Sequence, residues 1–290
     1  MPVPTSQTIW KHDSPPKKGL FRVEITRTTA LWPRKVYVQW IVREPKNPSG
    51  HLFSVYRSGS AEGPWEELLK DAADTYYLLD NNFPAPEDRT SPGLFSLRRT
   101  IYYKVVVTHT EDGTAETIKK LEADLPRRQR GIVRKLRRDA AVALKKGSGT
   151  EVAILKRKWW GEPCEECKSA VGQSTRGHCK ECNGTGIVHG YWDPVYGFAT
   201  RSATPVNVAT ENQGNVESHQ VEVKMLDIPE VERYDILVFL RDNERYIVNQ
   251  VVPTEIHTVN VHQELAVSEL SRSSREYAIK VDPWRDPEWF

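Results

Sequence analysis

The stretch Val36-Tyr37-Val38-Gln39-Trp40 decides the fold class of the first half of the chain. Its side chains alternate between two faces, as they do along a half-buried β-strand, and Tyr103-Lys104-Val105-Val106-Val107 shows the same alternation. Further short apolar runs lie on either side, and turn residues such as Glu111-Asp112-Gly113 separate them. Strands are expected over residues 21–25, 36–42, 53–57, 75–79, 102–108 and 116–121. Strands at this spacing predict a β-sandwich over residues 19–123.

Three features of this region occur in a recognisable order: Trp40 in the second strand, Phe53-Ser54-Val55-Tyr56-Arg57 leading to Gly63-Pro64-Trp65, and a tyrosine-rich strand before an Asp-Gly hairpin. The order resembles a fibronectin type III domain. The resemblance implies a fold and does not by itself imply a function.

The second half also indicates strands, over residues 221–225, 235–240, 245–251 and 258–267. Asp242-Asn243-Glu244 supplies the turn of a hairpin between the middle two. We therefore expect a small β-barrel or sandwich over residues 200–280. Residues 1–18 read as a proline-bearing extended arm and residues 281–290 as an aromatic tail. The fold class is mainly β and multidomain.

One long helix is expected within residues 124–150, ending at Gly147-Ser148-Gly149. An apolar stripe, widened by Val133, is expected to face the core; it consists of Ile132, Leu136, Ala140 and Leu144. Residues 127–146 hold nine Lys or Arg against the single acidic residue Asp139. This basic side is either a solvated face or a contact surface for nucleic acid or an acidic partner. Its contact residues would be Arg127, Arg130, Arg134, Arg137 and Arg138.

The only cysteines of the chain form two pairs, Cys164-x-x-Cys167 and Cys179-x-x-Cys182. Two Cys-x-x-Cys turns present four thiolates to one ion, which is typical of a structural zinc site. Glycines follow the second pair in Asn183-Gly184-Thr185-Gly186 and permit the tight turn of a zinc knuckle. The alternatives are local disulfides or a redox pair, and a neighbouring histidine, His178 or His189, could replace one ligand. The expected zinc-knuckle insertion covers residues 151–199.

Composition narrows the class of protein. The net charge is +2, the hydrophobic fraction is 38% and the mean hydropathy is −0.58, which suits small domains outside a membrane. The first residues lack the apolar segment of a secretory signal, so we expect intracellular synthesis. Phosphate-binding glycine loops, nucleophile elbows and zinc-protease helices are missing from the sequence, and four thiolates leave a zinc ion without an open position. We expect a protein that is not an enzyme, with no catalytic residues.

The residues around the cysteines come in a fixed order. After the Arg-rich helix follow Val152-Ala153-Ile154-Leu155, Trp160-Gly161, the first Cys pair, Thr175-Arg176, the second Cys pair with its glycines, Gly190-Tyr191 and Pro194. Over residues 125–195 this order resembles a group of tailed-bacteriophage virion proteins of the neck, or head-to-tail connection.

This resemblance implies a structural subunit of a homo-oligomeric ring, or collar, beneath the portal of the virion. The subunit would be made in the host cytoplasm and would contact the portal and other neck or tail proteins, with packaged DNA in the channel as a further contact. Zn²⁺ would order the loop-rich insertion, and the β-sandwich would project outward.

Three aromatic residues of the tail, Trp284, Trp289 and Phe290, either fold back on the chain's own barrel or anchor on a neighbouring subunit. Two other functions stay open. A DNA-binding zinc protein, such as a regulator or a nuclease accessory, would use the helix within residues 127–146 for phosphate contacts. A chaperone-type zinc module is suggested by the likeness of residues 179–186 to the cysteine-rich repeat of J-domain chaperones, although that family needs several repeats.

Overall fold

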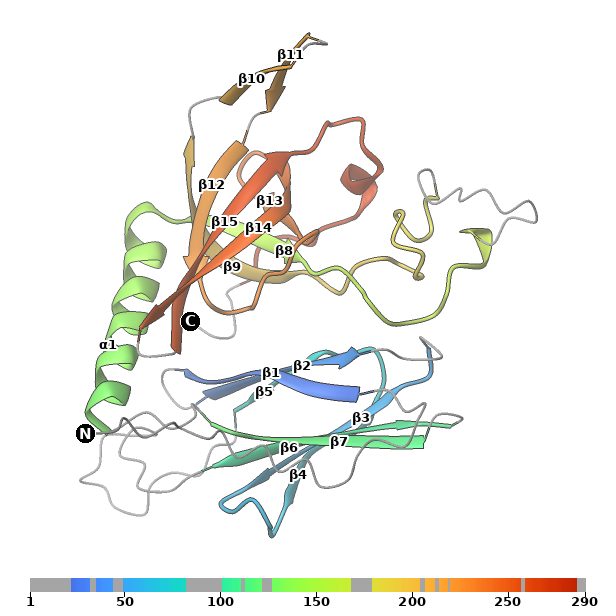
Figure 1. Cartoon of the computed structure of the whole chain (residues 1–290), viewed down its shortest axis with the longest axis vertical. Helices are drawn as coiled ribbons and strands as arrows, with labels where there is room; N and C mark the ends of the chain where they lie inside the picture. Colours follow the sequence, from blue (N-terminus) through green and yellow to red (C-terminus); the bar gives the residue numbers. More distant parts are fainter. Residues whose placement is uncertain are drawn as a thin grey trace.

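The computed structural model contains two β units, one above the other, with a single long helix at their side (Figure 1). It describes residues 22–31, 35–43, 49–81, 101–110, 113–121, 127–167, 179–203, 207–211, 214–218, 220–256 and 259–285. The predicted fold class, mainly β with one long helix, is confirmed. The extended arm predicted for residues 1–18 lies outside the described residues.

Among its described residues, the first unit has seven strands in two sheets. The strands are β1 (Arg22–Leu31), β2 (Lys35–Arg43), β3 (Leu52–Ser58), β4 (Glu66–Ala72), β5 (Tyr77–Asp80), β6 (Tyr102–His109) and β7 (Gly113–Lys120). One sheet has the order β1-β2-β5 and the other the order β4-β3-β6-β7. Trp40, Phe53 and Val105 are buried in the apolar core of this unit. Alternation along β6 predicted which of its side chains fill the core, whereas β2 is buried on both faces, with Tyr37 and Gln39 each 1% exposed.

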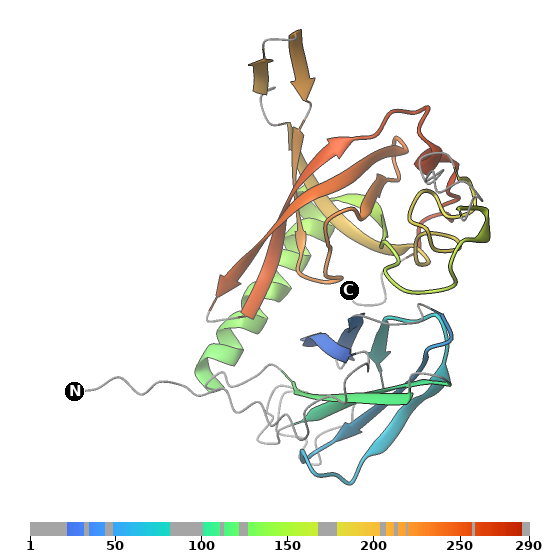
Figure 2. The same cartoon turned by 45° about the vertical axis from the view of Figure 1, so that its right-hand side comes forward.

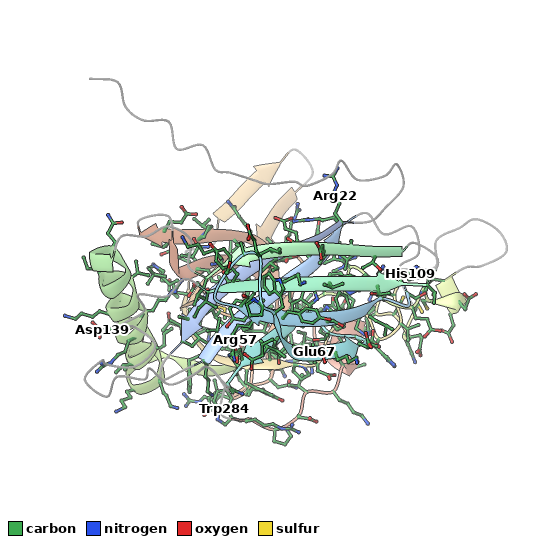
Figure 3. The ribbon with its side chains drawn as sticks, turned by 90° about the horizontal axis from the view of Figure 1, so that it is seen from below. Arg22, Arg57, Glu67, His109, Asp139 and Trp284 are labelled. Atoms are coloured by element: carbon green, nitrogen blue, oxygen red, sulfur yellow. The ribbon has the colours of Figure 1, made fainter. Side chains whose placement is uncertain are left out.

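A buried ion pair also fixes this unit internally. Arg57 lies among the sandwich strands (Figure 3) and its Nη1 donates to Asp80 Oδ2 at 2.7 Å. The Tyr103 hydroxyl donates to the same oxygen at 2.9 Å, and burial together with the nearby Asp80 carboxylate raises the pKa of Tyr103 well above its ordinary value. The charges are therefore paired inside the fold.

The second unit is a closed barrel with the strand order β12-β15-β14-β13-β8-β9. Its strands are β8 (Thr150–Leu155), β9 (Val195–Ala203), β12 (Gln220–Leu226), β13 (Ile236–Phe239), β14 (Glu244–Ile256) and β15 (Val259–Glu269). The predicted turn at residues 242–244 does join β13 and β14. β8 and β9 flank the cysteines, so the barrel begins before the predicted boundary at residue 200, and the knuckle is an excursion between two barrel strands.

Side chains of the barrel strands divide cleanly between its two surfaces. Val152 and Ile154 of β8 belong to the interior cluster, while Ala153 and Leu155 belong to an outer cluster. The C-terminal segment, with η5 (Arg275–Ala278), covers that outer face. Burial on both surfaces explains why β8 reads as a continuous apolar run.

The helix α1 (Arg127–Ala143) continues into one π-helical turn, η2 (Leu144–Ser148), and packs beside β12 and β15 (Figure 2). The predicted core stripe was wrong in part, because Ile132 and Leu136 are 43% and 37% exposed. Val133 and Arg137 are buried instead. The helix is rotated toward this neighbouring stripe because Arg137 forms a buried ion pair, described below. Asp139 lies on the outer side of α1 (Figure 3).

A two-stranded hairpin, β10 (Asn207–Glu211) and β11 (Gly214–Ser218), projects from the barrel between β9 and β12 (Figures 1 and 2). Within the described part of the chain, no helix has both the length and the apolar character needed to cross a membrane.

Candidate metal centre

The four predicted ligands converge at one point. The sulfur atoms of Cys164, Cys167, Cys179 and Cys182 all lie within 4.8 Å of one another. The Sγ atoms of Cys164 and Cys179 are 3.6 Å apart, and those of Cys167 and Cys182 are 3.3 Å apart. Three of the four residues are buried. The sequence pairs therefore meet in space as one cluster.

The sulfur spacing fits a tetrahedral metal ion. Zn–S bonds of about 2.3 Å place tetrahedral sulfur ligands roughly 3.8 Å apart, and a disulfide would bring two sulfurs to about 2.05 Å. The observed distances are close to the first value, and all four cysteines are free thiols in this structure. A metal bound here would have four sulfur ligands, a set that suits zinc or iron.

The backbone after the second pair shapes the site. Asn183, Gly184 and Gly186 have φ values of 47°, 77° and 84°. These left-handed residues curl the chain so that amides of Gly184 and Gly186 reach the Cys182 sulfur. Burial opposes ionisation of this thiol, but hydrogen bonds from Cys167 and these amides prevail and lower the pKa of Cys182 to about 7. The turn thus favours the thiolate that a metal binds.

Close packing fixes the two ends of the knuckle. The Cys164 amide donates to the Gly186 carbonyl at 3.0 Å, and the Val188 amide donates to the Glu162 carbonyl at 2.8 Å. A Cβ at Gly190, whose φ is 64°, would lie 2.5 Å from the Cys182 carbonyl oxygen. Only glycine permits this approach of the outgoing strand to the ligand turn.

The stem of the knuckle joins it to both β units. Two tryptophans of the stem, Trp160 and Trp192, pack on each other with ring centroids 5.5 Å apart and belong to the core cluster of the sandwich. Trp160 lies 6.4 Å from the Phe53 ring, and Trp192 lies 5.3 Å from the Tyr76 ring. We call Trp160 and Trp192 the tryptophan clamp. Sequence reasoning did not assign this role, and its only signal was the position of both residues next to the knuckle.

A charged cluster lies under the stem. Asp235 is fully buried, accepts from the amides of Arg157 and Glu232 at 2.8 and 2.7 Å, and lies 3.6 Å from Lys156 Nζ. Burial raises the pKa of Asp235 to about 6, although Lys156 and the two amides favour its ionised form. The cluster anchors the first residues of the stem to the barrel.

Asp235 predicts a pH dependence of stability. Its pKa in the folded state, about 6, is above the value of about 3.9 expected in the unfolded chain, so the folded state holds the proton more tightly. This contribution is fully present below about pH 4 and is lost as the pH rises through about 6; it amounts to ~3 kcal/mol. Urea titrations at several pH values should show a smaller fall in unfolding free energy over this window for Asp235→Asn. The exposed control Asp139→Asn should run parallel to the unmodified protein, and a parallel Asp235→Asn curve would contradict the assignment.

A second buried carboxylate links three parts of the molecule. Asp227 Oδ2 lies 3.1 Å from Arg137 Nη2 of the helix and 3.5 Å from Arg27 Nη1 of the sandwich. Arg137 also donates to the Asn260 carbonyl of the barrel. The Arg137 guanidinium is buried and bonded inside the protein, so it is not part of a surface for an outside partner.

The structure describes the side chains of only some of the other predicted contact residues. Arg138 is exposed on α1, together with Lys135. The side chains of Arg127, Arg130 and Arg134 are outside the described part, as are Trp289 and Phe290 of the tail. Trp284 packs edge-on against Tyr196 and Phe198 of its own β9, at 5.9 and 5.1 Å. Within this chain, Trp284 therefore anchors the tail to its own barrel.

No family model matches the chain, and a search of curated proteins finds no significant similarity.

Proposed function

We propose that the chain is a non-catalytic structural subunit in which one Zn²⁺ ion fastens a loop-rich knuckle between two β units. The observation that carries the proposal is the convergence of four thiols directly beyond the tryptophan clamp. A zinc ion with four thiolate ligands has no place for water or substrate, and its binding free energy becomes folding free energy. We propose zinc and not iron because two short Cys-x-x-Cys turns around one ion are the usual structural zinc arrangement.

We further propose that the subunit belongs to the neck of a tailed bacteriophage, in a homo-oligomeric ring beneath the portal. Support comes from the sequence order over residues 125–195. The seven strands in two sheets support the fibronectin type III-like assignment of the first unit. Apolar side chains left exposed on α1, namely Ile132, Leu136 and Val142, are suited to contact with a neighbouring subunit.

The alternative, a DNA-binding zinc protein, has one favourable observation. Four exposed basic residues lie on α1 and η2: Lys135, Arg138, Lys145 and Lys146. Contacts with phosphates would make the affinity fall steeply with salt.

Electron microscopy of the purified full-length protein separates the two functions. The neck proposal expects closed rings of one subunit number. The alternative expects a monomer that binds duplex DNA and loses affinity on Arg138→Glu but not on Arg241→Glu, a charge reversal in the exposed turn between β13 and β14. Monomers at all concentrations, with salt-dependent DNA binding, would overturn the neck proposal.

A further inference from the structure

An open groove runs along the barrel beside the knuckle stem. Its volume is about 910 Å³, and it is lined by the segment 230–234, by residues of β14 between 249 and 253, and by Trp159. β13 pairs with β14 only as far as Ile247, and the Val248 amide and carbonyl bond to Asp235 and Tyr234. Beyond this point β14 pairs with β15 on one side only, among the described residues. The groove therefore follows a free strand edge, which an extended peptide can line.

Cationic and aromatic side chains gather at this groove. Trp159 is 42% exposed, and the Arg157 guanidinium lies 4.7 Å from its ring and 5.3 Å from the Tyr234 ring. Arg233 is exposed and lies 4.7 Å from the Tyr234 ring. We call Arg157, Trp159, Arg233 and Tyr234 the Arg–aromatic cradle. Tryptophan, tyrosine and arginine are the residues most enriched at the energetic centres of protein interfaces.

The acidic residues of the groove already have cationic partners. Glu232 lies 3.3 Å from Lys156 Nζ and accepts from Trp159 Nε1 at 3.2 Å. Glu230 lies 3.3 Å from Arg27 Nε. Neither glutamate is paired with Arg157 or Arg233 in these contacts, so the cradle keeps a positive charge and is suited to a segment that is both acidic and aromatic.

We infer that the groove binds the segment Asp286-Pro287-Glu288-Trp289-Phe290 of a second copy of this chain. The segment has two carboxylates and two aromatic rings in five residues, which complement the two arginines and two aromatic rings of the cradle. A proline in the segment favours the extended backbone that a strand edge accepts. The inference names the contact that joins subunits, and it rests on the proposed assembly function for its partner.

The path of the C-terminal segment points to a second copy as the source. The residues before this segment start near the Arg245 end of β14, where the Arg245 side chain donates to the carbonyls of Glu276 and Ile279. They reach β9 at Trp284. β9 and β14 are three strands apart in both directions around the barrel. Three strand spacings cover roughly 14 Å at the backbone and more over the side chains, whereas five extended residues span at most about 17 Å. Residues 286–290 would be used up in reaching the groove wall at residues 249–253 of β14 in their own chain, whereas a second copy can present them there directly.

Complementation between two full-length variants tests the inference. Trp159→Ala/Arg233→Glu removes one aromatic ring and one cation from the cradle, and Trp289→Ala/Phe290→Ala removes the two aromatic rings of the tail. In sedimentation experiments each variant alone should self-associate at least about tenfold more weakly than the unmodified chain, the loss expected for hot-spot residues. Their equimolar mixture should form a heterodimer, because one intact cradle meets one intact tail. Arg241→Glu should associate normally.

Other outcomes separate this inference from the proposed function. Rings that persist in both variants would overturn the inference and leave the ring proposal standing. A monomeric protein that binds a labelled Asp-Pro-Glu-Trp-Phe peptide through the cradle would support the docking site and overturn the ring. Cradle-dependent binding of single-stranded DNA that the peptide does not displace would overturn the inference in favour of a nucleic-acid platform.

Discussion

Cys164→Ser is expected to abolish zinc binding and to unfold the knuckle over residues 156–194. The four sulfurs are within 4.8 Å of one another, and the loss of one leaves three thiols around a position that requires four. Structural zinc contributes on the order of 10 kcal/mol to the folding of small zinc domains, so the knuckle should lose all protection from hydrogen exchange. Chelation of the metal from the unmodified protein should give the same exchange pattern, and added zinc should reverse it.

The effect of Cys164→Ser should reach beyond the knuckle. The tryptophan clamp lies between the ligand turns and the sandwich core, so unfolding of the knuckle should expose Tyr76 and Phe53 and loosen the sandwich from the barrel. Assembly into rings should be lost as well. Lys180→Ser, an exposed position between the ligands of the second pair, is the matched control and should bind zinc normally. A Cys164→Ser protein that still binds one zinc ion and assembles would contradict the account.

Trp160→Ala should have the second largest effect. Trp160 is 5% exposed, and the loss of a buried tryptophan leaves a cavity that costs about 3–5 kcal/mol. Because its ring lies between Trp192 and the sandwich core, the loss should appear as separation of the two β units, with zinc still bound. Calorimetry should show two transitions in place of one, and the radius of gyration should increase.

The neighbouring residue provides an internal control for Trp160→Ala. Trp159→Ala removes the same side chain one position earlier, where it is 42% exposed, and should change the unfolding free energy by about 1 kcal/mol or less. Equal destabilisation by the two substitutions would contradict the assignment of Trp160 to the clamp.

The success and failure of strand prediction have identifiable causes. β6 was predicted because one of its faces is buried, which produces regular alternation. β2 was also predicted from alternation, although both of its faces are buried, and its β-branched and aromatic residues favour a strand in either case. β4 was not predicted, because Glu-Glu-Leu-Leu-Lys-Asp-Ala is an edge strand with few buried side chains and therefore little pattern. β10 and β11 were missed for a related reason: they pair only with each other and have polar sequences. Alternation of apolar and polar residues indicates that one face of a strand is buried. Strands with few buried side chains show little alternation and are therefore hard to predict.

The orientation of α1 shows what a helical pattern cannot predict. Ile132 and Val133 begin competing apolar stripes, and the four-residue repeat from Ile132 contains more apolar residues. The stripe that packs on the barrel contains Arg137, whose burial depends on Asp227, ninety positions away. From the sequence alone an arginine is expected at the surface, because its burial requires an acidic partner that the local pattern does not identify.

The metal centre and the tryptophan clamp differ in how far the sequence predicts them. The four ligands were predictable because zinc ligands occur in local pairs with narrow spacing. The clamp was not, because Trp160 and Trp192 acquire their role from Phe53 and Tyr76 of another unit. Local chemistry is thus readable from the sequence, while contacts between units depend on the folded arrangement.

Native mass spectrometry of the full-length protein tests the central claim most directly, because it counts subunits and metal ions in the same particle. The account predicts a single closed oligomer that carries one zinc ion per subunit and falls apart when zinc is removed. A metal-free monomer, or an oligomer whose subunit number does not change when zinc is removed, would contradict it.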